Sequence, residues 1–262
     1  DDDSNIVFYL GADLSYVNEM EDCGAVYKNS DNQETDVFDI FETAGANLIR
    51  VRLWHNPTWT NYSNLEDVKK TIRRAKDNNM SVLLDFHYSD TWADPTKQEI
   101  PFAWEINLNN DSLLGDMIYD YTYSTLTTLD SLKLSPEIVQ IGNEINPMIL
   151  QKGNLQWPID WDRNSLLLNK GIEAVRNFSE ETQNNIEIML HIAQPENGIW
   201  WFDQASNNNV VDYDWIGLSY YPQWSQYNLS NLEPILLTHH KLIDLHVDGI
   251  YQLRLLLFLQ IF

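Results

Sequence analysis

The amino-acid sequence predicts an α/β domain in which strands and helices alternate around a parallel sheet. Short apolar runs rich in β-branched residues recur along the 262 residues, and amphipathic stretches with helical periodicity separate them. Such uniformly apolar runs are typical of strands that are buried on both faces by layers of helices. The chain has no linker rich in Gly, Pro or Ser, no short internal repeat and no low-complexity block. We therefore predict a single domain over residues 1–262.

The predicted elements follow one another at regular intervals. Strands are expected at residues 7–13, 47–54, 81–87, 138–144, 186–192 and 212–221. Helices are expected at residues 35–44, 65–78, 111–132 and 164–178. Within 65–78, apolar residues recur every three or four positions and basic residues occupy the opposite face, which is typical of a helix packed on a core.

The charge balance limits the partners that this protein can have. Lys and Arg number 16 against 39 Asp and Glu, which gives a net charge of -23. Such an acidic surface repels the phosphates of nucleic acids and of anionic membranes. The chain has no stretch of eighteen apolar residues, so no membrane span is predicted. Its single cysteine, Cys23, cannot form an intrachain disulfide. We expect a monomer that binds a neutral or cationic partner, with no nucleic acid and no membrane span.

The first five residues are polar and lack an initiator Met. We interpret residues 1–5 as an exposed tail at a mature start, left after an export segment has been removed. This interpretation predicts a secreted, cell-surface or periplasmic protein, although a start trimmed for another reason would look the same.

Polar and aromatic side chains follow each predicted strand. Because the carboxyl ends of parallel strands meet at one rim of a barrel, residues far apart in sequence are expected to form one site there. The candidate residues for this site are Asp13, Arg50, His87, Trp92, Asn143, Glu144, His191, Tyr221 and Trp224.

Glu144 is the candidate catalytic residue. It follows Asn143 at the end of an apolar run; the pair alone favours a role in opening a loop, and the other strand ends reverse this interpretation. Polar strand ends, ten Trp and an acidic balance together favour a neutral polysaccharide substrate. Hydrolysis of a glycosidic bond needs two carboxylates, of which one protonates the leaving oxygen. Glu144 fits that acid if burial or a neighbouring carboxylate raises its pKa, and Asn143 would then hold a sugar hydroxyl.

Three other groups of residues leave alternatives open. Arg50 and Arg52 lie two apart on a strand and face the same side, so each needs a carboxylate and could belong to the site or to a structural salt bridge. His87 with Asp85 could bind a metal, but the spaced His or Cys residues of a metal site are missing, so a hydrogen-bonding role is expected. Sugar stacking and loop packing are equally open for the loop residues Trp92, Trp104, Trp200, Trp201 and Trp224.

Five motifs give the chain a family resemblance. They are Gly-Ala-Asp-Leu-Ser at 11–15, Arg-Val-Arg-Leu-Trp at 50–54, Asp-Phe-His-Tyr-Ser-Asp-Thr-Trp-Ala-Asp-Pro at 85–95, Gly-Asn-Glu-Ile at 142–145 and Gly-Leu-Ser-Tyr-Tyr-Pro at 217–222. Together they resemble the arabinogalactan endo-β-1,4-galactanases, family 53 of the glycoside hydrolases. The resemblance runs from about Phe8 to about Leu232, and the eleven-residue motif is its most specific part.

The resemblance implies a (β/α)8 barrel of clan A that hydrolyses β-1,4-galactan with retention of configuration. It also implies that Glu144 is the acid/base, that Asn143 binds the sugar at the cleavage point, and that Arg50, His87 and Tyr221 support the site. Another glycanase of this clan, such as a mannanase or a cellulase, is disfavoured by the 85–95 motif. No cofactor is implied. Bacterial relatives can carry calcium near their last two strand-end loops, but we expect those loops to be absent here and predict no metal.

The C-terminal part departs from the family pattern. The family nucleophile is a second glutamate after strand seven, in a run resembling Val-Val-Glu-Thr, and this chain has no such run. We therefore expect a barrel without its seventh and eighth βα units, and an atypical segment at 238–262 that lacks helical or alternating periodicity.

Two explanations of that segment are open. Codons for Leu-Arg-Leu-Leu at 253–256 can encode Glu-Thr-Ala in a shifted frame, so the segment could be an out-of-frame version of the true seventh strand; alternatively, it is a natural, divergent C-terminus. Two functions follow. One is an endo-galactanase, and the alternative is an inactive or truncated galactan-binding fragment without the nucleophile.

Overall fold

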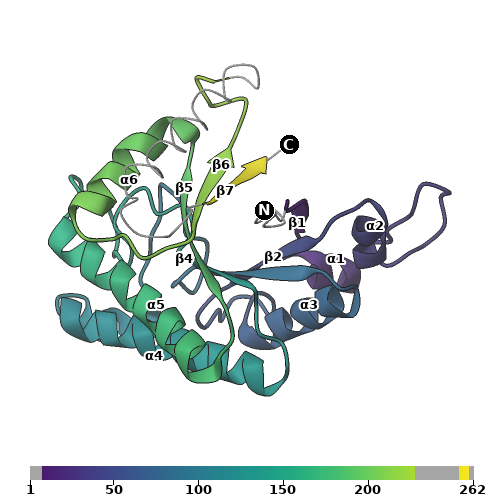
Figure 1. The fold of residues 1–262 in the computed structure, drawn as a ribbon, viewed down its shortest axis with the longest axis horizontal. Helices are drawn as coiled ribbons and strands as arrows, with labels where there is room; N and C mark the ends of the chain where they lie inside the picture. The colour runs from purple at the N-terminus through teal and green to yellow at the C-terminus, as the bar shows by residue number, and fades with distance from the viewer. Residues whose placement is uncertain (1–7, 228–253, 260–262) are drawn as a thin grey trace, which may run out of the picture.

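The computed structural model of the chain describes residues 8–227 and 254–259. Seven parallel strands pair in sequence order to form one curved sheet (Figure 1). They are β1 (Gly11–Asp13), β2 (Leu48–Leu53), β3 (Ser81–Phe86), β4 (Ile138–Ile141), β5 (Glu187–Ala193), β6 (Trp215–Tyr220) and β7 (Arg254–Leu259). Since β1 and β7 are the two edges of this sheet, the structure is an incomplete (β/α)8 barrel, as the sequence predicts.

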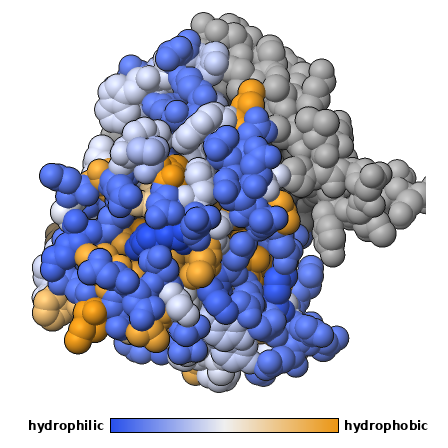
Figure 2. Space-filling model, turned by 90° about the vertical axis from the view of Figure 1, so that its left-hand side faces the viewer, coloured by the Kyte–Doolittle hydropathy of each residue, from blue (hydrophilic) through white to orange (hydrophobic). Residues whose placement is uncertain are grey.

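Helices cover the outer face of the sheet (Figure 1). They are α1 (Val17–Asp22), α2 (Val37–Thr43), α3 (Leu65–Asp77), α4 (Asp111–Ser131), α5 (Trp161–Thr182) and α6 (Gly198–Asn207), with short 3₁₀ turns η1 (Phe102–Asn107) and η2 (Pro195–Asn197). Their outward sides are mainly hydrophilic, as Figure 2 shows for the face on the side of α4, α5 and α6. Within the described part of the chain, no helix is both long and apolar enough to cross a bilayer.

The strands are buried on both faces because helices pack on one side and the barrel interior on the other. Every residue of β2 and of β6 is buried, which is why these strands appear in the sequence as apolar runs interrupted only by Arg50, Arg52 and Ser219. In-register parallel pairing, such as Arg50 with Leu83 and Leu83 with Ile138, brings the carboxyl ends of the strands to one rim. The candidate residues lie at that rim.

The C-terminal strand differs from the expectation. Residues 254–259 pair in parallel with β6, from Trp215 opposite Arg254 to Tyr220 opposite Leu259, so part of the segment that was predicted to be atypical extends the sheet. The run needs no alternation because a parallel strand can be apolar on both faces. The expected tail at 1–5, and residues 238–253 and 260–262, lie outside the described residues.

Helix α6 was not expected from the sequence. Its segment begins with Gly198 and contains Trp200, Trp201 and Phe202, and no side chain caps its amino end. Residues of these kinds are poor or neutral helix formers, so the segment lacks the usual start signals. Packing of the buried Trp201 against Trp161 of α5, and of the buried Phe202 against Tyr213, holds the helix in place instead.

Candidate active site

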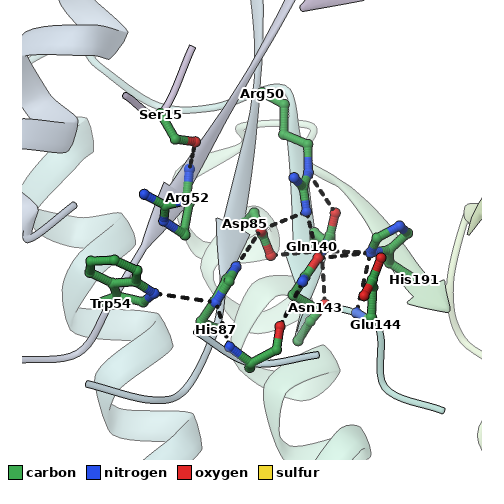
Figure 3. Close-up of polar contacts among 12 residues, drawn as sticks. Ser15, Arg50, Arg52, Trp54, Asp85, His87, Gln140, Asn143, Glu144 and His191 are labelled. Atoms are coloured by element: carbon green, nitrogen blue, oxygen red, sulfur yellow. Dashed lines mark hydrogen bonds and ion pairs between the residues drawn. The ribbon is translucent and has the colours of Figure 1, made fainter. Parts of the chain in front are cut away.

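A buried network centred on Arg50 lies at the carboxyl ends of β1 to β4 (Figure 3). Its guanidinium forms ion pairs with Asp13 at 2.6 Å and with Asp85 at 2.7 Å. The same group donates to Asn143 Oδ1 at 2.7 Å and to Gln140 Oε1 at 3.2 Å. Arg50 thus finds the carboxylate that a buried Arg requires, and it fixes the side chain of Asn143.

Asp85 and His87 form the second part of this network. Asp85 is completely buried and accepts from Arg50, from Gln140 Nε2 at 2.6 Å and from His87 Nε2 at 3.0 Å. Burial alone would raise the pKa of Asp85, but the charge of Arg50 and the close contact and hydrogen bond with His87 lower it to about 2. His87 Nδ1 accepts from Trp54 Nε1 and from the Ala93 N–H, so the proton of the neutral ring lies on Nε2.

Asn143 is oriented from both ends of its amide. Its Oδ1 accepts from Arg50, and its Nδ2 donates to the Ala93 carbonyl at 2.8 Å. An amide nitrogen has two hydrogens, so one remains available for a ligand. Asn143 Oδ1 also lies 3.0 Å from His191 Nδ1, and His191 Nε2 lies 3.0 Å from Ser219 Oγ. Burial, followed by the nearby charge of Arg50, lowers the pKa of His191 well below its usual value, so this ring is a neutral support beneath Asn143 and Glu144.

Glu144 is a buried acid at the centre of this rim. Tyr221 donates its hydroxyl proton to Glu144 Oε1 at 2.7 Å. Burial raises the pKa of Glu144, although the hydrogen bonds from Tyr221 and Ser219 and the charge of Arg50 act in the opposite direction. A carboxyl group with a raised pKa stays protonated at higher pH than a free glutamate, which is the requirement for a general acid.

The backbone around Glu144 is shaped to present this side chain. Glu144 has φ of 46°, in the left-handed region that non-glycine residues adopt at a cost of about 1–3 kcal/mol. Gly142 has φ of 81°, and a Cβ there would lie 2.5 Å from Ile145 Cγ2, so only glycine fits. Gln98 Nε2 donates to the carbonyls of Asn143 at 2.9 Å and of Glu144 at 3.2 Å, and thereby holds this turn.

Two aromatic side chains extend the site, one beside Tyr221 and one beside His87. Trp224 is exposed, and its ring centroid lies 5.2 Å from that of Tyr221. Trp92 is partly exposed and packs 5.6 Å from His87. The structure therefore brings all nine candidate residues to one rim, seven through hydrogen bonds or close polar contacts and the two Trp residues through ring contacts.

The expectation that Arg52 needs a carboxylate is wrong. Among the described residues Arg52 makes no ion pair, and its guanidinium donates to Ser63 Oγ at 2.9 and 3.3 Å. Three aromatic rings surround the guanidinium instead, with centroids 4.5 Å away for Tyr16, 4.3 Å for Trp54 and 4.2 Å for Trp92. Cation–π contacts thus replace the ion pair.

Two supporting residues were not identified from the sequence. Gln140 bridges Asp85, Arg50 and the Gly142 carbonyl, and its polar side chain within the apolar run 138–141 was an available signal. Gln98 lies in the loop after β3 and is distinguished by no sequence pattern.

No second catalytic carboxylate is present in this network of described residues. Besides Glu144, its carboxylates are Asp13 and Asp85, and both form ion pairs with Arg50. Strand β7, where the family resemblance places the nucleophile, has the sequence Arg-Leu-Leu-Leu-Phe-Leu. In the described ranges, no group of three or more His, Cys, Asp or Glu residues could hold a metal ion.

Comparisons with known proteins show which sequences and structures this chain resembles. The sequence model of glycosyl hydrolase family 53 matches residues 9–244. An arabinogalactan endo-β-1,4-galactanase of Cellvibrio japonicus is 54% identical over 90% of this chain and 64% of that protein. An endo-β-1,4-galactanase of Bacillus subtilis is 37% identical over 87% of this chain and 52% of that protein. The structure of an Ignisphaera aggregans GH53 catalytic domain superposes with a TM-score of 0.78 at 30% identity, over 92% of this chain and 66% of that one. The chain thus spans less than two thirds of these relatives.

Proposed function

The chain belongs to glycosyl hydrolase family 53, and from this membership we propose that it forms the barrel of an endo-acting hydrolase of β-1,4-galactan. The names of the Cellvibrio and Bacillus relatives support this substrate. We also propose that the protein acts outside the cytoplasm, where its polymeric substrate would be found. We propose further that it acts as a monomer with a single domain.

The observation that carries the proposal is the environment of Glu144. Its raised pKa, its hydrogen bond from Tyr221 and its place beside Asn143 fit a group that protonates the glycosidic oxygen. After bond cleavage the resulting Glu144 carboxylate would activate water, as in a retaining mechanism. Asn143, through its free amide hydrogen, would hold a hydroxyl of the sugar at the cleavage point.

Retention requires a second carboxylate about 5 Å from the first, to attack the anomeric carbon. Because Asp13 and Asp85 are paired with Arg50 and β7 has no carboxylate, we predict that the chain alone releases reducing ends from galactan slowly or not at all. Strand β7, without a carboxylate, also favours the second candidate function, a polypeptide that binds galactan without cleaving it. These two functions share the binding site and differ only in the chemistry.

Azide can test whether Glu144 is a working acid. As a small nucleophile in place of the missing carboxylate, azide would attack the anomeric carbon of a β-1,4-galacto-oligosaccharide while Glu144 protonates the departing oxygen. The C1–O bond breaks, a C1–N bond forms, and the products are an α-glycosyl azide and a shortened oligosaccharide. We expect this product from the unsubstituted chain and not from Glu144→Gln. Tight oligosaccharide binding with no azide product would favour the binding function, whereas absence of binding would contradict both.

A further inference from the structure

Two exposed tryptophans form a pair outside the site described so far. The ring centroids of Trp157 and Trp200 lie 5.7 Å apart, and the planes are tilted by 39°. The exposed fractions of the two residues are 63% and 43%. Trp157 lies in the connection between β4 and α5, and Trp200 lies in the first turn of α6.

Both rings lie on the rim that carries Glu144, because their segments leave the carboxyl ends of β4 and β5. Asn146, two residues after Glu144, donates to the Ala193 carbonyl at 2.9 Å and accepts from the Ala193 N–H at 2.7 Å. Asn197 also donates to the Ala193 carbonyl, at 3.0 Å. The turn that presents Glu144 is therefore bonded directly to the end of β5, from which the loop leads to Trp200.

The aromatic residues after β6 connect to the same loop. Glu196 Oε1 accepts from Ser225 Oγ at 2.6 Å and from the Gln226 N–H at 2.5 Å. These bonds join the segment of Trp224 to the segment of Trp200. Aromatic rings thus continue along one rim from the partly buried Tyr221 and the exposed Trp224 to the Trp157–Trp200 pair.

The loop of Trp157 is supported by residues that also hold Glu144. Gln151 Oε1 accepts from the Gln156 N–H at 2.6 Å, and the Gln151 N–H donates to the Gln98 carbonyl at 2.6 Å. The side chain of Gln98 donates in turn to the Glu144 carbonyl. The position of Trp157 is therefore coupled, through two buried glutamines, to the position of the acid.

Exposed paired indoles are costly in water, and their faces suit the apolar faces of sugar rings. We propose that Trp157 and Trp200 form a galactosyl-binding platform for the part of the galactan chain that leaves with the protonated oxygen. This inference rests on the proposed function. Glu144 gives its proton to the oxygen of the leaving sugar, so that sugar lies on the Glu144 side of the cleavage point. The β4 and β5 connections extend from Glu144, whereas Arg50 and Trp92 belong to the β2 and β3 side.

Binding of β-1,4-galacto-oligosaccharides of two to eight units, measured by calorimetry, tests the platform without requiring turnover. We expect Trp157→Ala and Trp200→Ala each to weaken binding of the longer oligosaccharides about 3–10-fold, and to leave binding of the disaccharide unchanged. Leu132→Ala is the matched control, because Leu132 is comparably exposed but follows α4 at the opposite end of the barrel. All three positions are exposed, so the fold should be retained.

The direction of the bound chain needs a second measurement. A spin label on the reducing end of an octasaccharide should broaden the indole N–H resonances of Trp157 and Trp200, which the two variants assign, and a label on the non-reducing end should not. If the chain binds galacto-oligosaccharides and neither Trp substitution changes the affinity, the platform is wrong while the proposed function stands. If only the non-reducing-end label broadens these resonances, the assignment to the leaving side is wrong. If no galacto-oligosaccharide binds, the proposed function fails and the platform with it.

Discussion

Replacing Asp85 by Asn tests whether the charge network positions the site. Asp85 is completely buried and accepts hydrogen bonds from Arg50, Gln140 and His87. Asn keeps the shape but removes the charge opposite Arg50, and its amide hydrogens would face the Gln140 amide. Removing one partner of a buried ion pair costs about 3–5 kcal/mol. Arg50 would keep Asp13 as a second partner, so we expect a loss of unfolding free energy near the lower end of this range, about 3 kcal/mol at neutral pH.

The pH dependence gives a second magnitude. The pKa of Asp85 falls from 3.8 to about 2 on folding, and at about 1.4 kcal/mol for each pKa unit this corresponds to about 2 kcal/mol of stability. Because the folded-state pKa is the lower one, the unfolded chain takes up the proton first as the pH falls. This stabilisation is complete above about pH 5 and is lost as the pH falls toward 2. The difference in unfolding free energy between the two proteins should therefore shrink by about 2 kcal/mol over that interval.

Urea unfolding followed by tryptophan fluorescence, at a series of pH values from 7 to 2.5, measures this difference. Asp31→Asn is the control, since it removes one carboxylate from the exposed surface and corrects for the general effect of net charge. A stability difference between Asp85→Asn and the unsubstituted chain that stays constant, or grows as the pH falls, would refute the assigned charge network.

Three further predictions concern the acid, the ring cluster and the turn. Tyr221→Phe removes a hydrogen bond that stabilises the Glu144 carboxylate, so the pKa of Glu144 should rise further. Carbon-13 NMR of the labelled carboxyl group measures this pKa. A pKa that is unchanged or lower would contradict the assigned contact. Arg52→Gln removes three cation–π contacts and should lower the unfolding free energy by about 1–3 kcal/mol, since relief of the buried charge offsets part of the loss; unchanged urea unfolding would show that the ring cluster stabilises nothing. At position 142 the backbone φ is 81°, and an added Cβ would lie 2.5 Å from Ile145 Cγ2. Gly142→Ala should therefore destabilise the chain by about 2 kcal/mol or more and abolish the azide product. A stable, azide-reactive variant would mean that the turn adapts.

The strand ends were predictable because two simple patterns coincide there. Strands of a parallel barrel are apolar on both faces, so a polar residue that ends an apolar run stands out, as Asn143 and Glu144 do. Topology then brings these ends together without further information. The same logic could have identified Gln140, which interrupts the run three residues before Asn143.

Contacts between loops could not be predicted in this way. The two hydrogen bonds from Gln98 to the Glu144 turn depend on the path of the β3–α4 loop, and nothing in the neighbouring sequence encodes that path. The ring cluster around Arg52 likewise joins Tyr16, Trp54 and Trp92 from three connections. A buried Arg predicts an ion pair by charge alone, and only the packed structure shows aromatic faces in its place.

The two halves of the proposed chemistry are separable in this fold. The described partners of Arg50, Asp85 and Asn143 come from β1 to β5 and the connections that follow these strands, and Tyr221, which contacts Glu144, follows β6. The attacking group, in contrast, would have to come from a strand beyond β6. Since β7 has no carboxylate, the proposed nucleophile can be missing while the proposed acid keeps its described partners on β1 to β6. That separation is why an added nucleophile should restore bond cleavage through Glu144, and why loss of turnover need not mean loss of galactan binding.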